Sequence, residues 1–153
     1  MITATVEIPT GSKMKYEINK AAGILVLDRV ISIPYPANYG FINDTLWYDG
    51  DPLDVFIISS EPLQPLSIVK IVPYAIIKCN DNGEKDDKVL AVIEGDLSPF
   101  VTDEIYTFLQ VYKKGFEVQK IEYTEETLKA IELGKGMYED KLIAESMLGL
   151  RGY

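Results

Sequence analysis

The amino-acid sequence predicts a mainly β (α+β) fold, in which one β-barrel-like domain carries a few peripheral α-helices. Segments that alternate apolar and polar residues dominate the first part of the chain, whereas helical spacing of apolar residues appears only later. No repeat, low-complexity tract or change in composition divides residues 1–153, so we expect a single domain. A chain of 153 residues, 47% hydrophobic and 25% charged, is long enough to bury a core.

The N-terminal segments have the alternation typical of half-buried strands. Apolar residues alternate with polar ones over Ile2–Ile8 and again over Met14–Ile18, and a Pro/Gly turn at 9–12 separates the two. We therefore expect these segments to pair as a hairpin. The next strand is predicted at Ile24–Ile31, a β-branched run interrupted only by Asp28-Arg29.

Four more strands are predicted further along the chain. Three apolar, β-branched runs lie at Leu53–Ile58, Ile68–Lys78 and Lys88–Glu94, and Asn80–Gly83 supplies a turn between the last two. Phe116–Tyr123 alternates like one more strand. This number of short strands in one domain favours a barrel-like sheet over a helical fold.

The later part of the chain predicts helices. Apolar residues recur at helical spacing over Pro99–Lys114. Thr124 is expected to cap a second helix that ends near Gly134, because glutamates in its first turn suit the helix dipole. A further helical segment is expected from Tyr138 to Leu148, and the tail 146–153 is expected to cover an interface or to cap the core.

Charge and composition exclude several classes of function. The chain has 24 acidic and 15 basic residues, and its net charge of −9 opposes binding to nucleic acid or to an anionic membrane. Histidine is absent, which excludes histidine general bases, Ser-His-Asp triads and His-ligated zinc. Any metal must be held mainly by oxygen atoms, and such sites favour Mg²⁺, Mn²⁺ or Ca²⁺.

Features of the chain favour a cytoplasmic protein. Cys79 is the single cysteine and has no partner for an internal disulfide, which suggests a reducing compartment. Met1–Glu7 lacks the basic and apolar regions of a secretory signal. The longest uncharged apolar stretch, around Ile71–Ile77, is far too short to span a bilayer.

The most informative stretch is Asp49–Asp54, which reads D-G-D-P-L-D. Its three aspartates repel one another, so a fold holds them close only with compensating cations. Gly50 and Pro52 suit a tight bend that aims the three carboxylates into one cavity. A calcium-binding EF-hand loop does not fit, since its twelfth-position acid would be Ser60. A solvated acidic turn is the alternative interpretation of this stretch taken alone.

A second acidic group precedes Lys88 and consists of Asp81, Glu84, Asp86 and Asp87. Taken alone it reads as a hydrophilic hairpin tip, and it gains interest only if it shares metals with the first group. Arg29 interrupts an apolar strand, where a charged residue needs a partner or a purpose. The segment Tyr35–Gly40 has two hydroxyl donors between Pro and Gly, and taken alone it reads as a structural turn.

In order along the chain, these segments resemble the family I soluble inorganic pyrophosphatases over about residues 4–145. The resemblance rests on segments that occur in the family's order: V-E-I-P at 6–9, K-Y-E at 15–17, D-R at 28–29, Y-P-A-N-Y-G-F-I at 35–42, D-G-D-P-L-D-V at 49–55, P-L-Q-P at 62–65, the loop 81–88, and Y-K at 112–113. The D-G-D-P-x-D-V run is close to diagnostic when the Tyr-Pro-x-Asn-Tyr-Gly segment precedes it.

The resemblance implies a set of metal-binding carboxylates: Asp49, Asp54, Asp81, Asp86 and Glu17. Asp54 would bridge two activating metals, Asp81 would help to hold a metal that arrives with the substrate, and Glu17 would coordinate another. Asp51 would be the general base, and Glu7 would belong to the outer shell. The implied cofactor is Mg²⁺, for which Mn²⁺ can substitute, while the larger Ca²⁺ is expected to inhibit.

The resemblance also implies a grip on pyrophosphate by cationic and hydroxyl groups: Lys15, Arg29, Tyr39, Lys88, Tyr112 and Lys113. Paired divalent ions would activate a water for in-line attack and neutralise the substrate, which lets an acidic protein bind an acidic substrate. The expected fold is a five-stranded, OB-like closed β-barrel with flanking helices.

Departures from the family pattern bear on metal binding and assembly. Asn82 replaces a second acid beside Asp81, the segment 97–105 is short, and Thr107 and Val111 stand where bacterial relatives have histidines near subunit contacts. A homo-oligomer, a hexamer by resemblance, is nevertheless expected. The rival interpretations are a barrel that binds single-stranded nucleic acid, an inactive relative kept as a scaffold, and a phosphohydrolase acting on nucleotides or polyphosphate.

Overall fold

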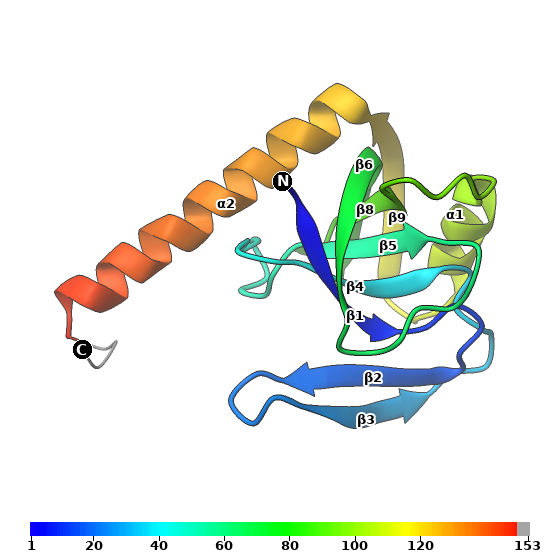
Figure 1. Ribbon diagram of the computed structural model, residues 1–153, viewed down its shortest axis with the longest axis horizontal. Coiled ribbons are helices and arrows are strands. Elements are labelled where there is room, and N and C mark those ends of the chain that lie inside the picture. The colour runs from blue at the N-terminus through cyan, green and yellow to red at the C-terminus, as the bar shows by residue number, and fades with distance from the viewer. Residues whose placement is uncertain (150–153) are drawn as a thin grey trace.

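The computed structural model describes residues 1–149, which form nine strands and two helices (Figure 1). The elements follow one another as β1 (Thr3–Ile8), β2 (Met14–Asn19), β3 (Ile24–Val30), β4 (Asn38–Ile42), β5 (Asp54–Ile58), β6 (Ile68–Asp81), β7 (Glu84–Lys85), β8 (Lys88–Ile93), α1 (Thr102–Val111), β9 (Phe116–Tyr123) and α2 (Thr124–Met147).

Five strands close into a ring. They are hydrogen-bonded in the order β1-β4-β5-β8-β6, and β6 also pairs with β1, which closes the circuit. The β5–β8 pair is parallel and the other pairs in the ring are antiparallel. The expected five-stranded closed barrel is therefore present, with β9 and the short β7 added along β6.

Alternation along the ring strands separates two apolar clusters. One cluster takes buried side chains from all five ring strands, including Val6, Ile42, Val55, Ile76 and Val89. The other lies on the opposite face, where Phe56 and Leu90 pack with residues of α1. Because residues two apart in a strand share a face, Asp54 and Lys88 lie on that second face, beside α1.

The pairing expected for the N-terminal strands was wrong. β2 does not form a hairpin with β1; it pairs with β3 as a separate two-stranded sheet that lies beside the barrel (Figure 1). β1 instead pairs with β4 and β6. Local alternation identifies a strand but not its partner, and in the pairing with β4 and β6 the apolar residues Ala4, Val6 and Ile8 of β1 are buried.

The segment expected to be only a turn contains β4. Asn38 at its start is fully buried and donates from Nδ2 to the Ile57 carbonyl 2.8 Å away. At Gly40, an added Cβ would lie 2.0 Å from the Thr5 carbonyl oxygen, so β4 approaches β1 too closely for any side chain. Pro36 therefore lies in the turn that leads into β4, whereas Gly40 lies within β4 and allows its close packing against β1.

The helical prediction for residues 124–148 needs two corrections. The two expected segments form one helix, α2, which continues through Gly134, where an added Cβ would make ordinary van der Waals contacts with Thr45 and Leu46. The backbone N–H of Leu46 donates to the Gly134 carbonyl at 3.0 Å. The residue before the helix is Tyr123, and Thr124 is not an N-cap, since its hydroxyl bonds the Tyr74 carbonyl. The first helix is also shorter than expected, with Thr102–Val111 replacing Pro99–Lys114.

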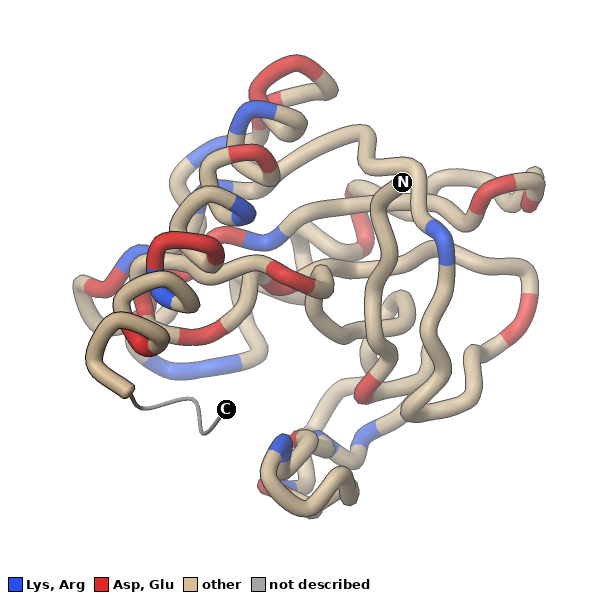
Figure 2. Tube along the Cα trace, turned by 60° about the vertical axis from the view of Figure 1, so that its left-hand side comes forward, with Lys and Arg blue, Asp and Glu red and all other residues tan. Residues whose placement is uncertain are grey.

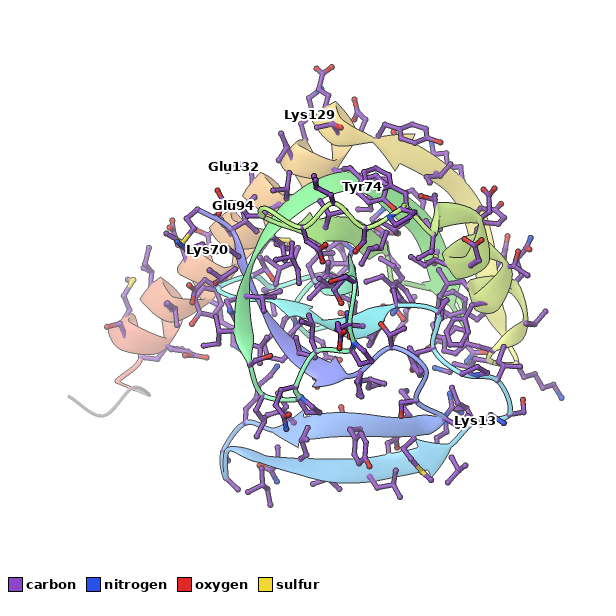
Figure 3. The ribbon with its side chains drawn as sticks, turned by 45° about the vertical axis from the view of Figure 1, so that its right-hand side comes forward. Lys13, Lys70, Tyr74, Glu94, Lys129 and Glu132 are labelled. Atoms are coloured by element: carbon purple, nitrogen blue, oxygen red, sulfur yellow. The ribbon has the colours of Figure 1, made fainter. Side chains whose placement is uncertain are left out.

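The far half of α2 extends beyond the barrel (Figure 1). Figure 2 shows positions of both charge signs along this helix, and the exposed pair Lys129–Glu125 at 3.4 Å is one example. Figure 3 shows Lys129 and Glu132 pointing away from the barrel. Met147 and Leu148 are 82% and 72% exposed, so this part of the tail does not cap the core, and residues 150–153 lie outside the described range. Neither helix in residues 1–149 is long and apolar enough to cross a membrane.

Candidate active site

Three carboxylates from two separate parts of the chain converge on the second face of the barrel. Asp49 comes from the loop that leads into β5, Asp54 is the first residue of β5, and Asp86 comes from the loop between β7 and β8. One oxygen from each of the three lies within 4.8 Å of the others. The all-oxygen donor set matches the preference of hard divalent cations. The two acidic groups, which the family resemblance placed in one metal-binding set, therefore meet in space.

Lys88 lies between these carboxylates. Its ammonium nitrogen is 2.7 Å from Asp54 Oδ2, 3.0 Å from Asp86 Oδ1 and 2.7 Å from the Tyr39 hydroxyl, and the residue is 2% exposed. Burial lowers the pKa of Lys88, but the charges around it, that of Asp54 first, raise it well above its ordinary value. A charged Lys88 thus offsets part of the repulsion among the aspartates.

The bend predicted at 49–54 is present. Gly50 adopts a left-handed φ of +85° that glycine tolerates best, and its N–H donates to the Trp47 carbonyl at 3.1 Å. The Trp47 N–H donates to the Asp51 carbonyl at 2.8 Å, and the Asp51 N–H donates to Asp49 Oδ1 at 3.1 Å. These bonds leave the Asp51 side chain exposed in the cavity wall. Burial raises the pKa of Asp49 to about 7, and the charges of Asp86 and Asp54 add to the effect.

The β2–β3 sheet supplies the opposite wall. Lys15 and Glu17 of β2 line the cavity, and Lys15 forms an ion pair with Asp28 at 3.3 Å. Arg29 is the direct partner of Lys15 in β3 and lies beside the cavity rather than in its lining. Its Nε and Nη2 atoms are buried and have no hydrogen-bond partner among residues 1–149. Buried guanidinium nitrogens without partners are costly, and an anion in the cavity would offset that cost.

The end of α1 and the segment after it complete the site. Lys113 forms an ion pair with Asp81, and both line the cavity. The Tyr112 ring stacks on Phe108 with centroids 5.0 Å apart, and burial raises the pKa of its hydroxyl to about 12, so Tyr112 remains a neutral donor. The Tyr39 ring packs edge-on against Phe56 with centroids 4.8 Å apart.

Together these walls enclose a cavity of about 260 Å³. Of the twelve residues that the sequence singled out, all but Arg29 line it. Eight carboxylates and four lysines contribute to the lining; they are Glu7, Glu17, Asp49, Asp51, Asp54, Asp81, Glu84, Asp86, Lys15, Lys20, Lys88 and Lys113. This excess of carboxylates fits divalent cations, and the lysines fit an anion held between those cations and the protein.

Several residues of the site carried no strong signal in the sequence. Glu7, expected only in the outer shell, lines the cavity, where its Oε2 accepts the Ile18 N–H at 3.0 Å. Burial raises the pKa of Glu7 to about 7. Lys20 also lines the cavity, although nothing in its local sequence distinguished it, and so does Tyr35, one of the two hydroxyl donors of the segment Tyr35–Gly40. Asp87, expected at an exposed hairpin tip, is instead 1% exposed.

Clustered carboxylates that face lysines across one cavity suit the binding of metal ions and the transfer of phosphoryl groups. A family model described as inorganic pyrophosphatase matches residues 4–139. The chain belongs to this inorganic pyrophosphatase family.

Relatives from plants, algae and bacteria agree with this assignment. Soluble inorganic pyrophosphatase 2 of Chlamydomonas reinhardtii is 34% identical, with 95% of this chain and 85% of that protein aligned. The soluble inorganic pyrophosphatase of Oryza sativa subsp. indica is 37% identical over 90% of this chain and 72% of its own. The inorganic pyrophosphatase structure from Thermus thermophilus superposes with a TM-score of 0.84 at 29% identity, covering 90% of this chain and 91% of that one. The inorganic pyrophosphatase structure from Helicobacter pylori superposes with a TM-score of 0.81 at 30% identity, covering 90% of this chain and 92% of that one.

Proposed function

We propose that this chain hydrolyses inorganic pyrophosphate to two phosphates and that Mg²⁺ is its activating cation. The observation that carries the proposal is the cluster of Asp49, Asp54 and Asp86 oxygens within 4.8 Å of one another, facing cationic groups across one cavity. Pyrophosphate is small and densely charged, and such a substrate needs cations and hydrogen-bond donors rather than an apolar pocket.

The carboxylates divide between two tasks in this proposal. Asp49, Asp54 and Asp86 would hold the activating cations, and Asp81 and Glu17 would help to hold a cation that arrives with the substrate. Bound Mg²⁺ supplies positive charge that neutralises the substrate and makes water more acidic. Mn²⁺ is expected to substitute, and Ca²⁺ to inhibit, because the larger ion holds its ligands at longer distances.

The reaction itself is assigned to groups at the mouth of the carboxylate cluster. Asp51, exposed in the cavity wall, would accept a proton from the attacking water while the oxygen of that water forms a bond to one phosphorus atom of pyrophosphate. The bond from that phosphorus to the bridging oxygen breaks, and the leaving phosphate keeps the electron pair. Cationic and hydroxyl donors would bind and orient the two phosphate groups: Lys15, Arg29, Tyr39, Lys88, Tyr112 and Lys113.

Three further properties are part of the proposal. Residues 1–153 would act as one domain, the protein would work in the cytoplasm, and several copies would assemble, as a hexamer by family resemblance. The name "soluble" carried by the plant and algal relatives supports the location. Sedimentation of the purified protein, which measures its mass in solution, tests the assembly.

The test of the activity is phosphate release by the purified protein from a panel of substrates. Pyrophosphate, tripolyphosphate and ATP are offered separately with Mg²⁺, with Ca²⁺ and with a chelator. We expect rapid release from pyrophosphate with Mg²⁺ alone. Faster turnover of ATP or tripolyphosphate than of pyrophosphate would show that pyrophosphate is not the preferred substrate. Salt-sensitive binding of a single-stranded oligonucleotide, without phosphate release from any of the three compounds, would favour the nucleic-acid interpretation.

A further inference from the structure

One buried carboxylate has no task in the proposed reaction. Asp87 is 1% exposed and lies directly between Asp86 and Lys88 in the sequence. Its side chain does not line the cavity. A buried carboxylate is costly unless several donors stabilise it, so its contacts indicate what it does.

The Asp87 carboxylate joins two separate parts of the site. Oδ2 accepts the indole N–H of Trp47 at 3.1 Å, and Oδ1 accepts the backbone N–H of Cys79 at 3.0 Å. The ammonium groups of Lys85 and Lys78 lie 3.3 and 3.8 Å from Oδ2. Both carboxylate oxygens are thus occupied, and charge on Asp87 is compensated.

Each of these contacts leads to a residue of the carboxylate cluster. Trp47 begins the bend that carries Asp49, and its backbone N–H holds the Asp51 carbonyl at 2.8 Å. On the other side, the Cys79 carbonyl accepts the backbone N–H of Asp86 at 3.0 Å. One buried side chain therefore links the loop that carries Asp49 to the loop that carries Asp86.

We propose that Asp87 and Trp47 form a positioning pair that holds the two aspartate-bearing loops at the separation needed to bind a divalent cation. This inference rests on the proposed function for its catalytic consequence, but its effect on cation binding stands independently. Replacing a residue that orients metal ligands without contacting the metal itself typically lowers metal affinity or activity by about 10–100-fold.

The experiment is a double-mutant cycle with Asp87→Asn and Trp47→Phe, read out by calorimetric titration of Mg²⁺ into the metal-free protein. An asparagine whose amide oxygen keeps the Cys79 N–H turns its NH₂ group toward the Trp47 indole N–H, so the contact with Trp47 is lost. Phenylalanine removes the indole donor and keeps a ring in the core. We expect each single variant to bind Mg²⁺ about tenfold more weakly. The double variant should lose far less than the hundredfold product, because both changes break one contact.

A matched control and a stability measurement separate positioning from simple loss of stability. Asp103→Asn removes the same charge from an exposed site in α1 and should leave the Mg²⁺ affinity unchanged within about twofold. Variants with a lower Tm but unaltered Mg²⁺ affinity would overturn the proposal, as would independent, multiplicative effects. If Asp87→Asn does not fold, the Mg²⁺ affinity of Trp47→Phe alone tests the proposal, and an affinity equal to that of the wild type would overturn it. Weakened Mg²⁺ binding in a protein whose wild type releases no phosphate would support the positioning pair and reject the proposed hydrolysis.

Discussion

The ammonium group of Lys88 lies 2.7 Å from Asp54 Oδ2, and the two residues are direct partners in the parallel register of β5 and β8. Two ring strands thus fix a buried ion pair next to the carboxylate cluster. A parallel register requires a long connection between the two strands, here residues 59–87, and that connection carries Asp81 and Asp86. The fold of the barrel therefore brings together the first and second acidic groups.

Replacing Lys88 tests the contribution of this ion pair. Lys88→Met leaves Asp54 and Asp86 buried without their cation, and we expect the metal-free protein to lose about 3–5 kcal/mol of unfolding free energy. Added Mg²⁺ should raise the Tm of the variant more than that of the wild type, because the cation replaces the missing charge. Denaturant unfolding with and without Mg²⁺ measures both effects. Lys129→Met, at an exposed position of α2, should cost less than about 1 kcal/mol; an equal loss in both variants would contradict this account.

Two buried guanidinium nitrogens of Arg29 lack hydrogen-bond partners among residues 1–149, and we therefore predict a substrate-binding role for this residue. Arg29→Ala should raise KM for pyrophosphate or lower kcat/KM by about tenfold to a hundredfold, because a charged hydrogen bond to phosphate is lost. The Tm should change little or rise, since the buried Nε and Nη2 atoms lack partners. Lys13→Ala is the control, because Lys13 is exposed at the start of the β2–β3 sheet (Figure 3). If Arg29→Ala had the same KM and kcat/KM as the wild type, Arg29 would have no role in binding pyrophosphate.

The raised pKa of Glu7 predicts that the free energy of unfolding depends on pH. Burial raises its pKa to about 7 in the folded protein from 4.5, so the folded state binds more protons than the unfolded state between these values. The resulting stability is fully present below pH 4.5 and is lost as the pH rises through 7. In the metal-free protein, Glu7→Gln should flatten this part of the profile by on the order of 2 kcal/mol. Urea unfolding between pH 5 and 8 measures the difference, and parallel profiles for both proteins would show that Glu7 ionises normally.

Two glycines in contrasting positions test the packing of the barrel. An added Cβ at Gly40 would lie 2.0 Å from a backbone oxygen of β1, whereas Gly136 in α2 has no heavy atom within 4 Å of the same position. We expect Gly40→Ala to destabilise the protein by about 3 kcal/mol through overpacking. Gly136→Ala should stabilise it by about 0.5–1 kcal/mol through helix propensity. Thermal unfolding compares them, and a tolerated alanine at residue 40 would argue against the close β1–β4 approach.

The sequence predicted what depends on local pattern and on family motifs. Alternation located most of the strands, and the D-G-D-P-L-D run with its bend identified the main acidic loop. Pairing was predicted less well, because the partner of β1 depends on residues more than thirty positions away in β4. Gly134 looked like the end of a helix, since nothing in the local sequence shows that Leu46 packs there.

Burial of single charged residues was the hardest property to predict. Asp86 and Asp87 are neighbours of the same type, yet one lines the cavity and the other is buried behind it, bound to Trp47. Local pattern alone does not decide which of two adjacent acids faces the cavity, although the family resemblance pointed to Asp86. The register of β8 against β5 and β6, which fixes the direction of Lys88, supplies the physical reason.

The most direct test of the central claim is phosphate release from pyrophosphate by the wild type and by Asp51→Asn, each with saturating Mg²⁺. The exposed Asp51 side chain makes little contribution to packing, so the variant should fold and bind Mg²⁺ nearly as the wild type does. Its turnover should fall by about 10²–10⁴-fold, as expected for loss of a general base. A folded wild type that releases no phosphate, or an Asp51→Asn variant that turns over at the wild-type rate, would contradict the account.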